Sequence, residues 1–185
     1  MDAPVQPSHT IELRVDHLAH LFDPLDPFPT PTRDLSRTAE DFIVGWAREL
    51  PENAALSIVI YLGEETGEGA AAGVCEAMRR HFTARAEHVR GDINELFRVG
   101  RTSLLIGLVV LAGCILASTL ASRLFGAAPL ARFFTEGLII LGWVANWRPI
   151  EIFLYDWWPL AKQRKLFERI AAASIDVRAA AERRV

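Results

Sequence analysis

The clearest pattern along the chain is an uncharged run between Arg101 and Arg123. Its residues, TSLLIGLVVLAGCILASTLAS, are all apolar, small or hydroxyl-bearing. An α-helix rises about 1.5 Å per residue, so about 20 apolar residues cross a hydrocarbon core of about 30 Å. The run is too long for an ordinary buried helix, and it predicts a membrane span at about residues 102–122.

A second apolar stretch follows after a short turn. Phe133–Trp147 is apolar apart from Glu136, and it continues into the charged segment Arg148–Leu160. We predict a second span at about residues 133–156, because a single span would leave its apolar surface without a partner helix. The two spans and their turn then form a transmembrane helical hairpin at residues 101–160.

Residues 1–100 contain the strand and helix patterns of a small α/β (α+β) domain. Ile11–Val15 alternates apolar and polar residues, and Ala55–Leu62 is rich in β-branched residues, so each segment predicts a strand. A helix from about Ser36 to Leu50 lies between them and favours a parallel pair with a right-handed crossover. The expected apolar stripe of this helix is Phe42, Ile43, Trp46 and Leu50.

A long amphipathic helix then leads from about Glu68 into the first span. Its apolar face carries Val74, Met78, Phe82, Ala86, Val89 and Ile93. Residues 161–185 begin as a basic helix, and the alternating segment Ser174–Arg178 predicts a third strand beside the other two. The predicted fold is a cytoplasmic domain of two to three strands and helices, fused to the hairpin.

The distribution of positive charge predicts the orientation. Positive residues flank the hairpin at Arg90, Arg98, Arg101, Lys162, Arg164, Lys165 and Arg169, whereas the turn carries only Arg123 and Arg132. The positive-inside rule then predicts a multi-pass protein of the cell inner (plasma) membrane with both termini cytoplasmic. The N-terminus lacks the pattern of a signal peptide. The formal net charge of −3, without a Lys/Arg block, argues against a nucleic-acid partner.

One candidate functional cluster lies at the end of the second span. It comprises Trp143, Asn146, Trp147, Arg148, Glu151, Tyr155 and Asp156. Charges near membrane depth are costly and often functional, and on a continued helix Arg148 and Glu151 are neighbours that can pair. The alternative is an aromatic belt at the cytoplasmic interface, with the charges at headgroup level and the helix bent at Pro149.

A second candidate feature is a stripe of small residues on the first span. Gly113, Ala117 and Ala121 are four residues apart, a pattern that lets helix backbones approach closely. Gly137, Gly142 and Ala145 are the expected partners on the second span. The stripe is consistent either with packing inside the chain or with an oligomer contact, and the sequence leaves both open.

The sequence contains few candidate metal-binding or catalytic motifs. His17, His20, Asp23 and Asp26 stand three apart and are residue types that bind zinc or manganese, but Pro24 and Pro27 exclude a helix here. His81 and His88 are seven apart and are expected on the polar face of the long helix. The P-loop, Rossmann, GxSxG and HExxH motifs are absent. We therefore expect no metal, no cofactor and no catalytic residue.

The segments Phe97–Leu108 and Glu136–Leu160 resemble small two-span inner-membrane proteins of bacteria whose function is unassigned. The resemblance covers the hairpin and its flanks, and it implies a bacterial membrane origin without supplying any site residue.

The pattern favours a non-catalytic, membrane-anchored accessory or scaffold protein that presents its small domain to a protein partner. A homo-oligomeric channel is the alternative, with Thr102, Ser103, Ser118, Thr119, Ser122, Glu136 and Asn146 as the polar groups of its pore. A metal-dependent enzyme that uses the His17–Asp26 loop is the third hypothesis. The expected partners are the lipid bilayer and a protein, either foreign or a second copy.

Overall fold

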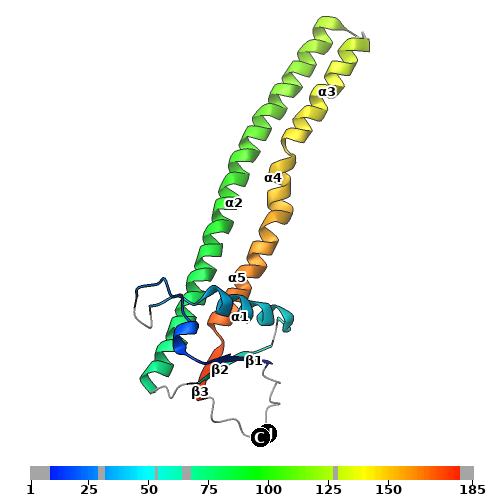
Figure 1. Ribbon diagram of the computed structural model, residues 1–185. Coiled ribbons are helices and arrows are strands. Elements are labelled where there is room, and N and C mark those ends of the chain that lie inside the picture. The colour runs from blue at the N-terminus through cyan, green and yellow to red at the C-terminus, as the bar shows by residue number, and fades with distance from the viewer. Residues whose placement is uncertain (1–8, 29–31, 53, 64–67, 127–128, 180–185) are drawn as a thin grey trace, which may run out of the picture. The chain divides into compact units, whose positions relative to one another are not determined.

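A computed structural model describes residues 9–28, 32–52, 54–63, 68–126 and 129–179 (Figure 1). The described chain forms two compact units. Unit 1 comprises residues 1–89 and 162–185, and unit 2 is Arg90–Ala161. The helix α2 (Glu68–Phe125) and the helix α5 (Trp157–Ala171) each contribute residues to both units.

Unit 1 contains a three-stranded parallel sheet in the order β1-β2-β3, made of β1 (His9–Val15), β2 (Leu56–Leu62) and β3 (Ser174–Ala179). Ile11 lies opposite Ile58, and Ile58 lies opposite Ile175. The predicted parallel pair is confirmed. The third strand is also confirmed, because β3 pairs with the other edge of β2.

Helices supply the rest of the core of unit 1. The helix α1 (Arg37–Glu49) begins where the Ser36 hydroxyl accepts a hydrogen bond from the Ala39 amide, a common helix cap. The core holds buried apolar residues of the strands, of the loop that follows β1, and of α1, α2 and α5, among them Leu21, Phe22, Ile43, Ile58, Ile60, Met78, Phe82 and Ile170. The expected apolar face of the long helix, from Val74 to Ile93, is buried as predicted.

The predicted stripe of α1 is wrong in part. Ile43 is buried, but Phe42 and Trp46 are exposed, and α1 buries Ala39, Val44 and Ala47 instead. With 3.6 residues per turn, the predicted stripe and the buried residues form two arcs of the helix surface that overlap at Ile43. The hydrophobicity of the side chains alone did not decide which arc is covered. The 3₁₀ turn η1 (Leu18–His20) and the loop after it carry the chain from β1 to α1.

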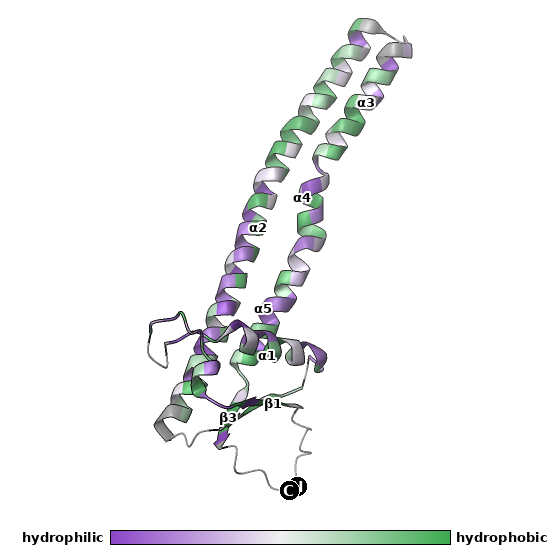
Figure 2. Cartoon of the chain, viewed as in Figure 1, coloured by the Kyte–Doolittle hydropathy of each residue, from purple (hydrophilic) through white to green (hydrophobic). Residues whose placement is uncertain are grey.

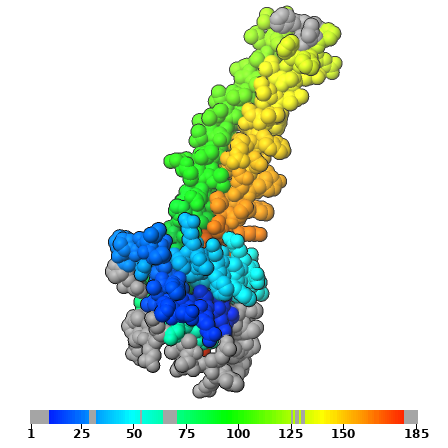
Figure 3. All heavy atoms as spheres, viewed as in Figure 1, coloured from blue at the N-terminus to red at the C-terminus, as the bar shows by residue number. Residues whose placement is uncertain are grey.

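Unit 2 is an antiparallel helical hairpin. Its first arm is the uninterrupted α2, and its second arm comprises α3 (Pro129–Ala145), α4 (Trp147–Glu151), the π-helix η2 (Ile152–Asp156) and the start of α5. Two helical stretches, Ala71–Leu124 and Arg132–Ala171, are long and apolar enough to cross a membrane. Figure 2 shows apolar residues concentrated along α3 and the facing part of α2, and Figure 3 shows the two arms in contact.

Candidate functional site around Asn146 and Arg148

Asn146 occupies the break between α3 and α4 and is 6% exposed. Its backbone amide donates to Trp143 O at 3.0 Å, three residues back, so the last turn of α3 is tighter than an α-helix. That shift frees Gly142 O from its usual backbone donor, and the Asn146 side-chain amide donates to it at 3.0 Å. The same Nδ2 donates to Gly107 O on α2 at 3.1 Å. Asn146 therefore caps its own helix and joins the two arms.

The side-chain amide of Asn146 packs against the backbone of Gly107. A Cβ at Gly107 would lie 2.6 Å from Asn146 Oδ1 and 3.0 Å from Ala145 O. Asn146 Oδ1 is buried and has no hydrogen-bond partner among the described atoms, and its place over the Gly107 backbone suits a weak contact with the Cα hydrogens. Only glycine permits this approach.

The break itself follows from Pro149. A proline lacks the amide hydrogen that would bond Ala145 O, and its ring crowds that carbonyl, so the helix ends at Ala145 and restarts at Trp147. The predicted interruption is present, but it falls at Asn146 rather than at Pro149. The second arm does not leave α2 there, since Gly100 on α2 still faces the side chains of Ile152 and Phe153 beyond the proline.

Arg148 is the centre of the charged part of the site. Its Nη1 lies 3.0 Å from Glu151 Oε2 and 2.9 Å from Asp156 Oδ2, so one guanidinium binds both carboxylates. The Glu151 contact is the neighbouring pair expected on a continued helix. The Asp156 contact connects the start of α4 to the end of η2. Arg148 is half exposed, and this cluster is therefore open to its surroundings rather than enclosed by the hairpin.

The facing residues place this charged cluster along the hairpin. Three contacts align the arms: Phe97 lies against Trp157, Gly100 faces Ile152, and Gly107 accepts from Asn146. Residue numbers therefore rise along α2 as they fall along the second arm. Arg148, Glu151 and Asp156 thus lie opposite the stretch of α2 between Phe97 and Gly107. That stretch contains Arg98 and Arg101, where the uncharged run of α2 begins. Charge therefore appears at the same level on both arms.

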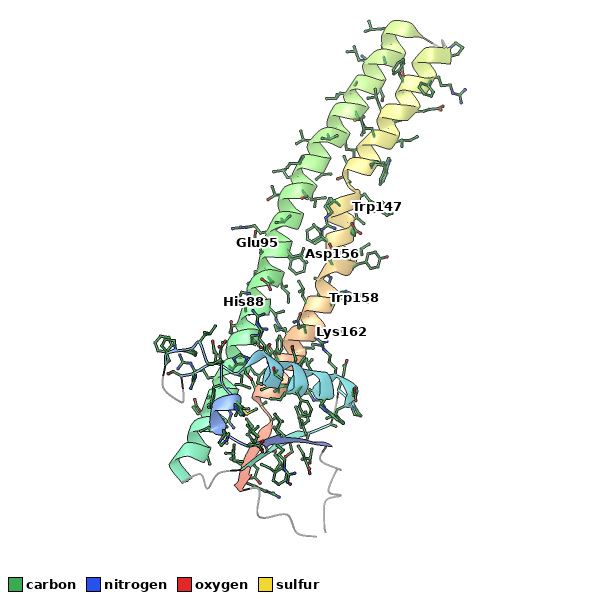
Figure 4. The ribbon with its side chains drawn as sticks, viewed as in Figure 1. His88, Glu95, Trp147, Asp156, Trp158 and Lys162 are labelled. Carbon is green, nitrogen blue, oxygen red and sulfur yellow. The ribbon has the colours of Figure 1, made fainter. Side chains whose placement is uncertain are left out.

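The aromatic residues of the second arm near this site divide into two sets. Trp143, Trp147 and Tyr155 are among the exposed side chains of the second arm, as is Trp158. Trp157 packs toward α2, with its ring 6.3 Å from that of Phe97, and its indole N–H donates to Phe153 O at 3.0 Å. Figure 4 labels Trp147, Asp156 and Trp158 along the second arm, and Glu95 on α2.

The small-residue stripe does not form the contact between the arms. Gly113 and Ala117 are exposed, and a Cβ at Gly113 would meet nothing within 4 Å. The first arm instead packs through Gly107, Cys114 and Ser118, to which Ala121 is adjacent as a half-buried residue. Of the expected partners, Gly142 lies against Leu111 and Gly137 lies in open space.

The His17–Asp26 residues are used for turns. The Asp23 carboxylate accepts from the Leu25 amide, and the Asp26 carboxylate accepts from the amides of Phe28 at 3.0 Å and Asp34 at 2.7 Å. These two amides hold the pKa of the Asp26 carboxyl below its ordinary value. Within the described residues, no three His, Cys, Asp or Glu side chains converge in a way that would hold a metal ion.

His81 is the residue that the sequence pattern misplaced. It is 8% exposed rather than on a polar face, with Nδ1 3.4 Å from Asp34 Oδ1 and Nε2 3.3 Å from Glu40 Oε2. Glu40 also pairs with Arg85 at 2.6 Å. The two ring nitrogens point at different carboxylates, so these groups do not surround one metal position. His81 connects α2, α1 and the loop before α1, and helical periodicity gave no signal for these long-range contacts.

Comparison with protein-family models, with curated proteins and with solved structures finds no match for this chain.

Proposed function

We propose that this protein is a non-catalytic integral membrane accessory or scaffold protein, in which unit 2 is embedded in the bilayer and unit 1 is presented to a protein partner in the cytoplasm. The observation that carries the proposal is the inverted burial of unit 2. Its exposed side chains include Leu105, Val109, Leu116, Leu120 and Ile140, whereas Cys114, Ser118 and Asn146 are buried. Between helices in lipid, small and polar residues are the expected contacts.

The hydrogen bonds that side chains donate to backbone carbonyls also support a lipid environment for the hairpin. A helix break inside hydrocarbon requires another donor for each freed carbonyl, because no water is present to supply one. Asn146 supplies that donor to Gly142 O. The hydroxyls of Thr119 and Ser122 likewise donate to carbonyls of their own helix, at Leu116 O and Ser118 O.

The proposed orientation places both ends of the chain in the cytoplasm. The cationic residues that flank the hairpin support it, together with the common level at which charges appear on the two arms. At the opposite end, Glu136 pairs with Arg132 at 2.9 Å, which lowers the cost of a carboxylate close to the membrane surface.

Single-cysteine labelling tests this topology. In a variant with Cys75 and Cys114 replaced by alanine, Arg123→Cys probes the turn and Glu168→Cys probes the cytoplasmic side. A membrane-impermeant maleimide should label the first in intact cells and the second only after permeabilisation. Labelling of both in intact cells contradicts the orientation, and recovery of the protein in the soluble fraction contradicts membrane insertion.

Exposed apolar side chains define a surface of unit 1 for the partner. Phe42 and Trp46 lie one turn apart on α1 with ring centroids 6.2 Å apart, and a monomer gains nothing from exposing such a pair. Native mass spectrometry of protein extracted into nanodiscs at its natural level should detect a foreign subunit in fixed stoichiometry. Trp46→Ala should release that subunit, whereas Arg48→Ala on the same helix should retain it. A lone monomer contradicts the scaffold proposal.

A homo-oligomeric channel is the second candidate, and the exposed Gly113 and Ala117 favour it because they offer a surface for close packing of chains. A closed ring of identical chains in the same mass spectrum, with ion flux in liposomes that Glu136→Gln alters, would replace the scaffold proposal. The metal-dependent enzyme is tested by elemental analysis of the purified protein, where a stoichiometric metal is required.

A further inference from the structure

Only one of the two arms of the hairpin is interrupted. Through α2 the helix runs 58 residues without a break, despite Gly91, Gly100 and Gly107. In the second arm, four helical segments replace one between Pro129 and Ala171. Pro149 and Pro159 each remove a backbone donor, and a π-helix lies between them at Ile152–Asp156. Such π segments inside α-helices are frequent at functional positions.

Side-chain donors bond two backbone carbonyls of the second arm next to this segment. Asn146 Nδ2 donates to Gly142 O before it, and Trp157 Nε1 donates to Phe153 O near its end. Each side is also fixed separately to α2. Gly142 lies against Leu111 before the segment, and the ring of Trp157 lies 6.3 Å from that of Phe97 after it. The two halves of the second arm therefore have independent supports on α2.

The Arg148–Asp156 ion pair is the contact that spans the irregular segment. Three other ion pairs among the described residues of unit 2 join residues three or four apart in sequence, as Arg98 and Glu95 do at 2.7 Å on α2. Arg148 and Asp156 are eight apart, and their 2.9 Å contact runs from the first turn of α4 to the last residue of η2. A bend of the arm that separates these two ends must break it.

We propose that residues 146–156 form a joint in the second arm, at which α3 changes its angle to α5, and that the Arg148–Asp156 ion pair holds the arm in the observed form. The pair is half exposed, so it is weak enough to be opened by salt or by a competing charge. This goes beyond the scaffold role, and it applies whichever partner unit 1 binds.

Distances between spin labels on the second arm test the joint. In a variant with Cys75 and Cys114 replaced by alanine, labels at positions 134 and 165 report the angle between α3 and α5 in nanodiscs. The parent should give a single narrow distance between the two labels. The Arg148→Gln variant, which lacks the ion pair, should give a second, shorter distance as well. Arg98→Gln removes a comparable ion pair from uninterrupted α2, and it should leave the distance unchanged.

A further variant separates a joint from general loosening. Adding Pro149→Ala to Arg148→Gln restores the backbone donor to Ala145 O, and it should return the distribution to one narrow distance. Labels at positions 80 and 110 on α2 should give the same distance in every variant, which shows that α2 remains a continuous helix. An unchanged distance in Arg148→Gln, or an equal change in Arg98→Gln, overturns the proposal.

Discussion

The two units of this chain bury opposite kinds of residue. In unit 1, the inside holds large aliphatic and aromatic side chains such as Ile58, Ile60 and Phe82, as in any water-soluble domain. In unit 2, large aliphatic side chains such as Leu105, Leu116 and Ile140 are exposed, with Ile152 a buried exception. Its inside holds Gly107, Gly142, Cys114, Ser118 and Asn146. The two units therefore differ in which residue types they bury, and this difference supports the proposal that unit 2 lies in lipid.

The strongest test of this comparison removes a leucine from each unit. Leu62→Ala in β2 empties a fully buried site and should lower the stability of unit 1 by about 2–5 kcal/mol. Leu120→Ala in α2, where the side chain is exposed, should change stability by less than about 0.5 kcal/mol. Hydrogen exchange with mass spectrometry on β2 and α2 peptides measures both. Equal losses would show that the outside of unit 2 is the core of a larger assembly.

A pair of glycines tests the contact between the arms. Gly107→Ala places a Cβ 2.6 Å from Asn146 Oδ1 and 3.0 Å from Ala145 O, and it should destabilise the hairpin by about 1–3 kcal/mol. Gly113→Ala meets nothing within 4 Å and serves as the control, since it should leave the hairpin intact. Unfolding by sodium dodecyl sulfate, followed by tryptophan fluorescence, reports the difference. Greater damage from Gly113→Ala would indicate that Gly113 packs against another chain.

Substitution of Asn146 tests whether a buried polar side chain stabilises unit 2. Asn146→Ala removes the donors to Gly107 O and Gly142 O, and should cost about 0.6–2 kcal/mol in the same unfolding assay. Thr119→Ala is the matched control, because that exposed hydroxyl donates only to its own helix at Leu116 O. No loss in Asn146→Ala would mean that packing of small residues alone holds the arms together.

A smaller effect is expected in unit 1, at the carboxylate of Asp26. Asp26 has a lowered pKa in the native state because the Phe28 and Asp34 amides donate to it. Its contribution to the stability of the loop is therefore fully present above about pH 4, and is lost as the pH falls through the lowered native pKa. Hydrogen exchange of these two amides should accelerate over that range relative to other loop amides. In Asp26→Asn this acid dependence should disappear, and its persistence would assign it to another group.

Local patterns were enough to predict the elements of this protein. The alternation of Ile11–Val15 and Ser174–Arg178 marked two strands that lie at the opposite edges of one sheet. The long uncharged run between Arg101 and Arg123 predicted the first apolar helix, and Pro149 predicted an interruption in the second. These features depend on residues close in sequence, so periodicity, capping and proline chemistry suffice to find them.

Contacts between distant residues were decided only by the tertiary structure. Gly113, Ala117 and Ala121 had the spacing of a packing face, but Gly107 and Cys114 took that place because the position of Asn146 fixed the register between the arms. The burial of His81 and the exposure of Phe42 depend in the same way on which side of a helix meets its neighbours. A periodic pattern fixes the faces of a helix, and the packing of the whole unit chooses which face is covered.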